Sequence, residues 1–428
     1  MKQIGIIGLG YVGLPLALQF AKSGAKVLGL DIDQTKADSL NEGKSYIKHI
    51  KDSTLQEQLE TKRLEATTDF SRVRELEAVL ICVPTPLNQE REPDLSYVLD
   101  TAKTIAPHLP KGIVVSLEST TYPGTTEEEL RPILEARSGL KAGTDFHLVY
   151  SPEREDPGNP VSQIAKIPKV IGGCTQKCLE KGKEVYSLAI ETLVPVSSCR
   201  VAEATKLTEN IFRCVNIALV NELKITYQQM SVDVWEVIEA AKTKPFGYMP
   251  FYPGPGLGGH CIPIDPFYLS WKAKQEGIEA RFIELAGEVN ASMPDHVVDG
   301  LRKVLAKHGK NINGANIIIV GLAYKPDVDD DRGSPSYALM HILENLGAKV
   351  GYYDPYISEI KPTRQFGEYA GRKSVIWSEK TIKPYDAALI STAHTEVLHE
   401  QLIDWVPCIV DTRNALKGRH DGINFIKV

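Results

Sequence analysis

Cys261 lies in a loop whose composition suits the presentation of a single nucleophile. The segment 252–266 reads YPGPGLGGHCIPIDP, and its glycines and prolines exclude a regular helix or strand. Such a loop, stiffened by proline and stripped of side-chain bulk before Cys261, can bring backbone N–H groups and one thiol against a ligand. A lone cysteine is usually inert apolar filler. The neighbouring His260 is assigned no role, because adjacent side chains often diverge.

A glycine fingerprint near the start of the chain indicates an oxidant. Gly8, Gly10 and Gly13 give G-x-G-x-x-G after an apolar run and at the start of a helical pattern. Glycines alone would indicate only a loop with positive φ angles, but this context suits a pyrophosphate at a helix N-terminus. Asp31, eighteen residues after Gly13, would bind the adenosine ribose and repel a 2′-phosphate. The pattern predicts NAD, and an oxidant in the same chain favours a catalytic Cys261.

A helical pattern places a lysine and an asparagine on one face. Lys206 and Asn210 are four residues apart, and Glu203 lies three residues before Lys206 on the same side. A Lys and an Asn that converge on one point would polarise a substrate oxygen and hold an oxyanion. Spacing alone favours the simpler interpretation, a solvated helix face with an ordinary Glu–Lys pair.

For two loops, the sequence supports ligand binding and a purely structural role about equally. Thr85, in the turn ICVPTP, either lines the nucleotide cleft, because ligands bind beyond the carboxyl ends of strands, or merely caps a loop. The segment 321–336 combines Lys325 and Arg332 with four aspartates. It is either a phosphate-binding turn or a self-neutralising surface loop.

These residues need strands and helices to position them. Apolar runs predict strands within residues 3–9, 26–33, 78–84, 112–120 and 146–153, separated by stretches able to form helices. From residue 201 one helical segment continues for some thirty residues without Pro or Gly, long enough to join domains and to offer a dimer surface. A second α/β pattern begins at 315–325 and continues through 348–355, 386–392 and 408–416.

The expected fold class is therefore α/β, with two Rossmann-like doubly wound domains joined by a central long helix and a helical dimerisation region. We place an NAD-binding domain at 1–200, a helical domain with the Cys261 loop at 201–308, and a second nucleotide-type domain at 309–428. A length of 428 residues fits two or three domains.

Composition excludes several other classes of protein. A net charge of -6 without Lys/Arg clusters gives no footprint for nucleic acid. The chain shows no secretory leader and no apolar run of membrane-spanning length, so a cytoplasmic location without membrane attachment is expected. Seven scattered cysteines argue against a disulfide framework, and Cys174 and Cys178 lack a second pair at ligand spacing, so no metal site is expected.

The motifs in chain order closely resemble those of the UDP-glucose/GDP-mannose dehydrogenase family over nearly the whole length. They are GLGYVGLPLA, ICVPTP, ESTTYPGTT, SPEREDPG, AEATKLTENIF, GPGLGGHCIPIDP, GLAYKPDVDDDR and DTRN. The resemblance implies an N-terminal NAD domain, a central helical dimerisation region and a C-terminal UDP-binding domain, with the active site between the two α/β parts.

The resemblance also implies a four-electron oxidation. The alcohol of a UDP-sugar gives a hydride to NAD, Cys261 adds to the resulting aldehyde, and the thiohemiacetal gives a second hydride to another NAD. The thioester is then hydrolysed. A thiolate suits this covalent role because it is both a good nucleophile and a good leaving group.

Residue roles follow from the resemblance by position. Lys206 and Asn210 would stabilise the alkoxide and the tetrahedral oxyanions, Asp265 and Thr121 would position water, and Glu153 would act as general acid/base. Which group takes the first proton stays open. The implied substrate contacts are Glu153, Arg154, Lys206, Asn210, Gly258, Lys325 and Arg413. The implied cofactor contacts are Gly8, Gly10, Tyr11, Val12, Gly13, Asp31, Thr85, Thr121 and Arg332.

Two segments resemble the branch that oxidises UDP-N-acetylhexosamines, and most of all the UDP-N-acetylglucosamine 6-dehydrogenases: REDPGN after Glu153, and GGHCIPIDP. The expected product is a uronic acid for polysaccharide or O-antigen precursors. UDP-N-acetylmannosamine and UDP-glucose stay open as substrates. A two-electron β-hydroxyacid dehydrogenase and a non-catalytic sensor of nucleotide sugars are further alternatives. A homodimer or higher homo-oligomer is expected, although the family's arginine lent by a neighbouring subunit has no clear match near residues 243–251.

Overall fold

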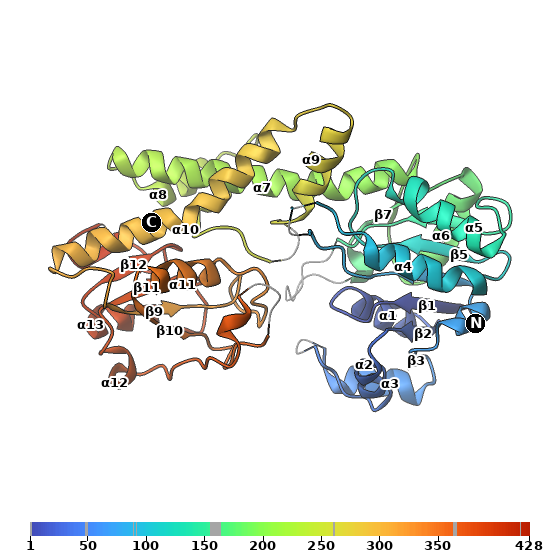
Figure 1. Ribbon diagram of the computed structural model, residues 1–428, viewed down its shortest axis with the longest axis horizontal. Coiled ribbons are helices and arrows are strands. Elements are labelled where there is room, and N and C mark those ends of the chain that lie inside the picture. Colours follow the sequence, from blue (N-terminus) through green and yellow to red (C-terminus); the bar gives the residue numbers. More distant parts are fainter. Residues whose placement is uncertain are drawn as a thin grey trace. The chain divides into compact units, whose positions relative to one another are not determined.

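The computed structural model describes residues 2–47, 50–88, 90, 92–154, 164–259, 262–362, 366–419 and 421–428. The chain divides into two compact units. Unit 1 comprises Met1–Glu209 and Phe267–Glu279, and unit 2 comprises Asn210–Pro266 and Ala280–Val428. Helices α7 (Cys199–Gln229) and α9 (Asp265–Gln275) each contribute residues to both units. In Figure 1 the colours run from the blue strands of unit 1 to the red strands of unit 2.

Unit 1 is built on a sheet of eight strands in the order β3-β2-β1-β4-β5-β6-β7-β8. Among the described strands of this sheet, neighbours run parallel except for β6 and β7. The central strands β4, β5 and β6 are buried along their whole length and mostly apolar, because helices cover both faces. The strands are β1 (Gln3–Ile7), β2 (Lys26–Leu30), β3 (Leu64–Thr67), β4 (Ala78–Ile81), β5 (Val114–Leu117), β6 (His147–Tyr150), β7 (Lys169–Gly173) and β8 (Leu193–Val196).

Two apolar clusters hold the helices of unit 1 on the sheet. One joins α1, α3 and α6 to one face, and the other joins α4 and α5 to the opposite face. The helices are α1 (Gly13–Lys22), α2 (Gln34–Asn41), α3 (Asp52–Glu60), α4 (Ser96–Ile105), α5 (Arg131–Ser138) and α6 (Gln176–Tyr186). Short turns η1 (Phe70–Glu75), η2 (Ala106–His108) and η4 (Ile164–Lys166) and the π-helical η3 (Thr125–Leu130) complete the unit.

Unit 2 contains a parallel sheet of five strands in the order β10-β9-β11-β12-β13. Helices α10 (Arg281–Lys307) and α11 (Pro335–Asn345) pack on one face, and α12 (Glu379–Ile382) and α13 (Leu402–Trp405) on the other. The strands are β9 (Asn316–Val320), β10 (Lys349–Tyr353), β11 (Ala387–Ile390), β12 (Ile409–Asp411) and β13 (Phe425–Lys427). Helix α8 (Val234–Ala241) and turns η5 (Gly367–Tyr369) and η6 (His399–Gln401) lie elsewhere in this unit.

The two Rossmann-like sheets and the long helix confirm the predicted fold class. The predicted strands all form, and the long helix α7 begins at Cys199. Strands β3, β7, β8 and β13 were missed. β3, β8 and β13 are edge strands, and the exposed Pro195 and Glu65 on two of them break the continuous apolar run of a buried strand. The three-domain boundaries stay a prediction. Within the described residues, every helix is too short or too polar to cross a membrane.

Candidate active site

The fingerprint glycines form the turn between β1 and α1, and each has a steric reason. Gly8 has a φ of +88°, which favours glycine. A Cβ on Gly13 would lie 1.9 Å from the carbonyl oxygen of Gly8, so α1 can approach the strand only with glycine there. A Cβ on Gly10 would meet no described atom within 4 Å, which leaves open space beside the N-terminus of α1. This arrangement fits a pyrophosphate.

Asp31 lies beside this turn at the end of β2. Its Oδ2 accepts a hydrogen bond from the Leu9 N–H at 2.8 Å, and its Oδ1 accepts one from the Asp33 N–H at 3.1 Å. The carboxylate is thus oriented from two sides before any ribose binds. Tyr46, which no sequence motif singled out, donates from its hydroxyl to the Leu9 carbonyl at 2.5 Å. These residues fit an NAD site, in which Asp31 would hold the ribose.

Glu153 and Lys206 meet within unit 1. Glu153 follows β6, and the Lys206 ammonium on α7 donates to its carbonyl at 2.7 Å, with its carboxylate at 3.5 Å. The next residue, Arg154, pairs with Glu209 on the same helix at 2.6 Å and donates to the Pro168 carbonyl. The turn after β6 is therefore tied to α7 at two consecutive residues.

A buried polar network that sequence reasoning missed supports this turn. Lys169 on β7 donates to the Pro152 carbonyl at 3.2 Å and pairs with Glu118 at 2.7 Å. Glu118 also accepts from the Tyr186 hydroxyl, which contacts the Ser116 hydroxyl at 2.7 Å. Burial raises the pKa of Glu118, although Lys169 opposes the rise. The strand pattern does not predict that Glu118 and Lys169 are buried together, because the members of the network come from β5, β7 and α6, which are far apart in the sequence.

A small cavity of about 30 Å³ lies between this network and the nucleotide turn. Val12 and Leu16 line it from the start of α1, and Glu118, Glu153 and Lys169 line it from the other side. A volume of this size is enough for a water molecule. The nucleotide turn and the Glu153 turn are therefore neighbours within unit 1.

Glu203, Lys206 and Asn210 are buried, with exposed fractions of 0%, 6% and 5%. The solvated helix face that spacing favoured is thus wrong, because strands and turns cover this side of α7. Glu203 accepts hydrogen bonds from the N–H groups of Gly124 and Thr126 and from the Thr126 hydroxyl. Burial raises the pKa of Glu203 to about 7 despite these donors.

Thr121 and Thr85 are the two predicted threonines of unit 1. Both are buried, with exposed fractions of 0% and 6%. Among the described residues, the Thr121 Oγ1 has no hydrogen-bond partner. A buried hydroxyl without a partner costs free energy, which is consistent with a water or ligand that completes it. Their roles, and that of Tyr11, stay predictions.

Asn210 and Asp265 meet within unit 2. The Asn210 amide donates to the Asp265 carboxylate at 2.5 Å, and Asp265 is 3% exposed. Asp265 is the first residue of α9, where the helix N-terminus favours a negative charge. Two residues that lie 55 positions apart thus form one buried polar pair.

The loop before Cys261 is held to α7 and to the loop between β9 and α11 within unit 2. The Gly254 N–H donates to Asn221 on α7 at 3.0 Å, and Asn221 donates to Asn290 on α10 at 2.9 Å. The Gly259 N–H donates to the Arg332 carbonyl at 3.0 Å, and Gly259 has a φ of +82°. Cys261 and His260 lie outside the described residues.

Glycines in this loop make room for side chains of unit 2. A Cβ on Gly254 would lie 2.4 Å from a guanidinium nitrogen of Arg413, and one on Gly258 would lie 2.7 Å from Tyr324. Arg413 donates to the Ser391 carbonyl at 2.8 Å. Burial lowers the pKa of Arg413 to about 10. A half-buried guanidinium beside a backbone-only surface suits an anionic ligand.

The two cations of the 321–336 segment behave differently. Arg332 pairs through two nitrogens with Asp330 of its own loop, at 2.8 and 2.6 Å. The Lys325 ammonium lies 5.8 Å from the centre of the Tyr324 ring. Arg332 thus follows the self-neutralising interpretation in this structure, while its cofactor contact and the substrate contact of Lys325 stay predictions.

The fold and these sites define a nucleotide-binding enzyme of the Rossmann-like class, with a dinucleotide turn in unit 1 and a second nucleotide-type sheet in unit 2. Sequence models of the UDP-glucose/GDP-mannose dehydrogenase family match in three parts: its NAD binding domain over residues 2–190, its central domain over 200–292 and its UDP binding domain over 318–418. The chain belongs to this family and is an NAD-dependent UDP-sugar dehydrogenase.

Relatives within the family act on different sugars. A UDP-N-acetyl-D-glucosamine 6-dehydrogenase of Salmonella typhi is 35% identical over 92% of this chain and 90% of its own. A UDP-N-acetyl-D-mannosamine dehydrogenase of Escherichia coli K12 is 38% identical over 79% and 82%. The solved structure of a UDP-D-ManNAc dehydrogenase from Pyrococcus horikoshii is 34% identical, with a TM-score of 0.89 over 100% of this chain and 99% of the other.

Proposed function

We propose that the protein oxidises the C6 alcohol of UDP-N-acetyl-D-glucosamine to a carboxylate, in a cytoplasmic pathway that makes precursors of polysaccharide or O-antigen. The reaction would consume two NAD and one water for each sugar. The observation that carries the proposal is the buried pair of Asn210 and Asp265, 2.5 Å apart. Asp265 lies four residues after Cys261 in the sequence.

The first oxidation needs groups that stabilise an alkoxide. NAD supplies the hydride acceptor for both oxidations. Lys206 is a buried cation, and the Asn210 amide keeps a second N–H for an oxygen while the first binds Asp265. A buried ammonium and an amide stabilise a developing negative charge more strongly than water does, because they are oriented beforehand.

The second oxidation and the hydrolysis need a covalent catalyst and a positioned water. The Cys261 thiol would add to the aldehyde and form a thiohemiacetal, which becomes a thioester after loss of a hydride. Asp265 would orient the water that attacks the thioester, with Thr121 as a further hydrogen-bonding group. Glu153, fixed by the Lys206 bond to its carbonyl, would exchange a proton as general acid/base.

The remaining proposed contacts divide between the substrate and the cofactor. Arg154, Gly258, Lys325 and Arg413 would bind the nucleotide sugar, and Tyr11, Val12, Thr85 and Arg332 would join the fingerprint residues at the cofactor. Support for Arg413 comes from its half-buried guanidinium beside Gly254, where a diphosphate or uracil oxygen would find hydrogen-bond donors.

The choice of UDP-N-acetylglucosamine rests on the REDPGN and GGHC sequence variants. UDP-N-acetylmannosamine is the nearest alternative, because relatives with that activity reach a similar identity. The test is an assay of purified protein with both sugars and UDP-glucose, with NADH counted by absorbance and the product weighed by mass spectrometry. We expect two NADH per uronate, and the highest kcat/KM with UDP-N-acetylglucosamine. One NADH per aldehyde would exclude the double oxidation.

We further propose that the enzyme is a homodimer that pairs through α7. Phe212 and Leu219, seven residues apart and therefore on one face of this helix, are 47% and 51% exposed. Phe282 and Leu285 on α10 are also exposed, at 78% and 54%. Large exposed apolar side chains that gather on helices are typical of subunit interfaces.

A further inference from the structure

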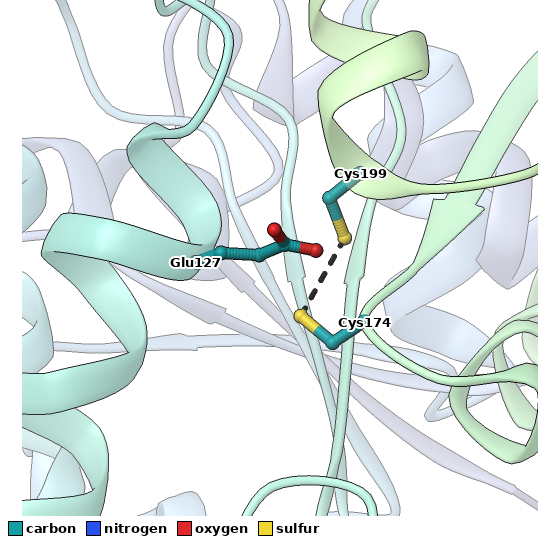
Figure 2. Close-up of side chains that lie close together, drawn as sticks. All are labelled: Glu127, Cys174 and Cys199. Atoms are coloured by element: carbon teal, nitrogen blue, oxygen red, sulfur yellow. Dashed lines mark hydrogen bonds between the residues drawn. The ribbon is translucent and has the colours of Figure 1, made fainter.

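Two cysteines of unit 1 lie against each other at the start of α7. Cys174 follows β7, Cys199 is the first residue of α7, and their sulfur atoms are 3.6 Å apart. Figure 2 shows both sulfurs and the Glu127 carboxylate directed toward the same point. One ligand atom from each of these three residues lies within 4.8 Å of the others.

The two thiols differ in access and in surroundings. Cys199 is fully buried and its sulfur also lies 3.5 Å from the Gly172 carbonyl, whereas Cys174 is partly exposed. The hydrogen bond with Cys174 and burial raise the pKa of the Cys199 thiol. Cys174 is therefore the thiol that an oxidant reaches first, and Cys199 is placed to resolve the product.

The surrounding charges favour a disulfide over a metal ion. Glu127 is already paired with Arg200, whose Nε lies 3.2 Å from its carboxylate. A divalent ion would have to displace this guanidinium or lie beside it. Only three candidate ligands are present among the described residues, whereas structural zinc sites use four. A disulfide needs no carboxylate and no added charge.

We propose that Cys174 and Cys199 form a reversible disulfide when the protein meets a peroxide. The Cys174 thiolate attacks one peroxide oxygen and becomes a sulfenic acid, with release of water. The Cys199 sulfur then displaces the hydroxyl from Cys174 as a second water. Two thiols are oxidised by two electrons in total, and one peroxide is reduced to two waters.

The bond would join the end of β7 to the first turn of α7. The sulfurs must close from 3.6 Å to about 2.05 Å, a shift that side-chain rotation and a small helix movement can supply. The bond closes a loop of 25 residues that contains α6 and β8. Cys199 lies one helical turn before Glu203 and two turns before Lys206. Oxidation would therefore restrict the movement of the part of α7 that carries both residues.

Peptide mapping after mild oxidation tests the proposal. The experiment uses the full-length Cys261→Ser variant, so that the proposed catalytic thiol does not react. Trypsin cleaves after Lys177, Lys181 and Lys183, so Cys174, Cys178 and Cys199 fall on separate peptides. We expect hydrogen peroxide to join the Cys174 and Cys199 peptides, dithiothreitol to separate them, and the unfolding midpoint to rise by about 5 °C in the oxidised protein.

Two variants control the experiment. Cys178→Ala removes a buried thiol of the neighbouring helix α6 and should keep the link. Cys199→Ala should abolish it and let dimedone trap Cys174 as a sulfenic acid, and Cys174→Ala provides a second test if that protein folds poorly. The proposal is wrong if both thiols remain open to alkylation after peroxide. It is also wrong if the reduced protein binds zinc through them, seen as loss of bound zinc in Cys199→Ala.

Discussion

Lys169 and Lys206 donate hydrogen bonds to the carbonyl groups of two consecutive residues, Pro152 and Glu153, at 3.2 and 2.7 Å. One lysine comes from β7 and the other from α7. Two buried cations thereby fix the turn after β6 from both sides. The proposed acid/base residue is positioned by a strand on one side and by the long helix on the other.

Replacing Lys169 tests whether this support matters for catalysis. Lys169→Met should leave Glu118 buried without its partner and lower the free energy of unfolding by about 3 kcal/mol. The double variant Lys169→Met/Glu118→Gln should recover most of that stability, measured by urea unfolding. If Lys169 positions Glu153, the double variant still has a kcat lowered about tenfold with KM little changed. Full recovery of kcat would assign the pair a purely structural role.

Removal of the proposed nucleophile separates the two oxidations. Cys261→Ser should stop turnover after the aldehyde stage, because serine is a poorer nucleophile and a poorer leaving group. Rapid-mixing absorbance should then show about one NADH or less per active site and no uronate. Steady turnover at the wild-type rate would instead indicate a two-electron dehydrogenase.

Loss of the Asn210 amide should weaken the stabilisation of the oxyanions. Asn210→Ala is expected to lower kcat about 100-fold, because it removes an oriented donor from a buried site. The matched control is Asn216→Ala, which lies farther along α7 and whose amide donates within the helix to Phe212. Kinetics with the control should be close to wild type, and an equal loss in both variants would speak against a specific role for Asn210.

Glu203 should make stability depend on pH. Its folded pKa of about 7 lies above its ordinary value of 4.5. Between these two pKa values the folded protein therefore binds more protons than the unfolded chain. The contribution of this proton binding to the free energy of unfolding is fully present below pH 4.5 and is lost as the pH rises through about 7. Relative to wild type, Glu203→Gln should gain about 2 to 3 kcal/mol in free energy of unfolding between pH 4.5 and 8. Urea unfolding at several pH values measures this, and a constant difference would contradict it.

Charged substitutions on α7 test the proposed dimer. Phe212→Glu/Leu219→Glu should shift the protein from dimer to monomer in light scattering after gel filtration. Ile376 is 76% exposed in the C-terminal sheet region, so Ile376→Glu serves as a control that changes an exposed apolar residue elsewhere. A dimer that survives the double substitution but not the control would place the interface away from α7.

Much of the architecture follows from local sequence patterns. Buried parallel strands read as apolar runs, and a helix of 31 residues without Pro or Gly is continuous in the sequence itself. The glycine fingerprint and Asp31 could be identified because the turn, the helix and the second strand are contiguous. Strand β7 was missed although it is fully buried, because its five residues include two glycines and a lysine.

Only the tertiary structure decided which polar residues are buried and with what partners. Asp31 follows β2 and Asp354 follows β10, the second strand of each sheet in chain order. By sequence position alone, the two aspartates are equivalent. Asp354, however, is saturated by the N–H groups of Leu322 and Ala323, by His394 and by its own turn. The Asp354 carboxylate therefore has little hydrogen-bonding capacity left for a ribose, whereas the Asp31 carboxylate accepts fewer hydrogen bonds and can still accept one. Burial and hydrogen bonding depend on residues distant in the chain, and no local pattern records them.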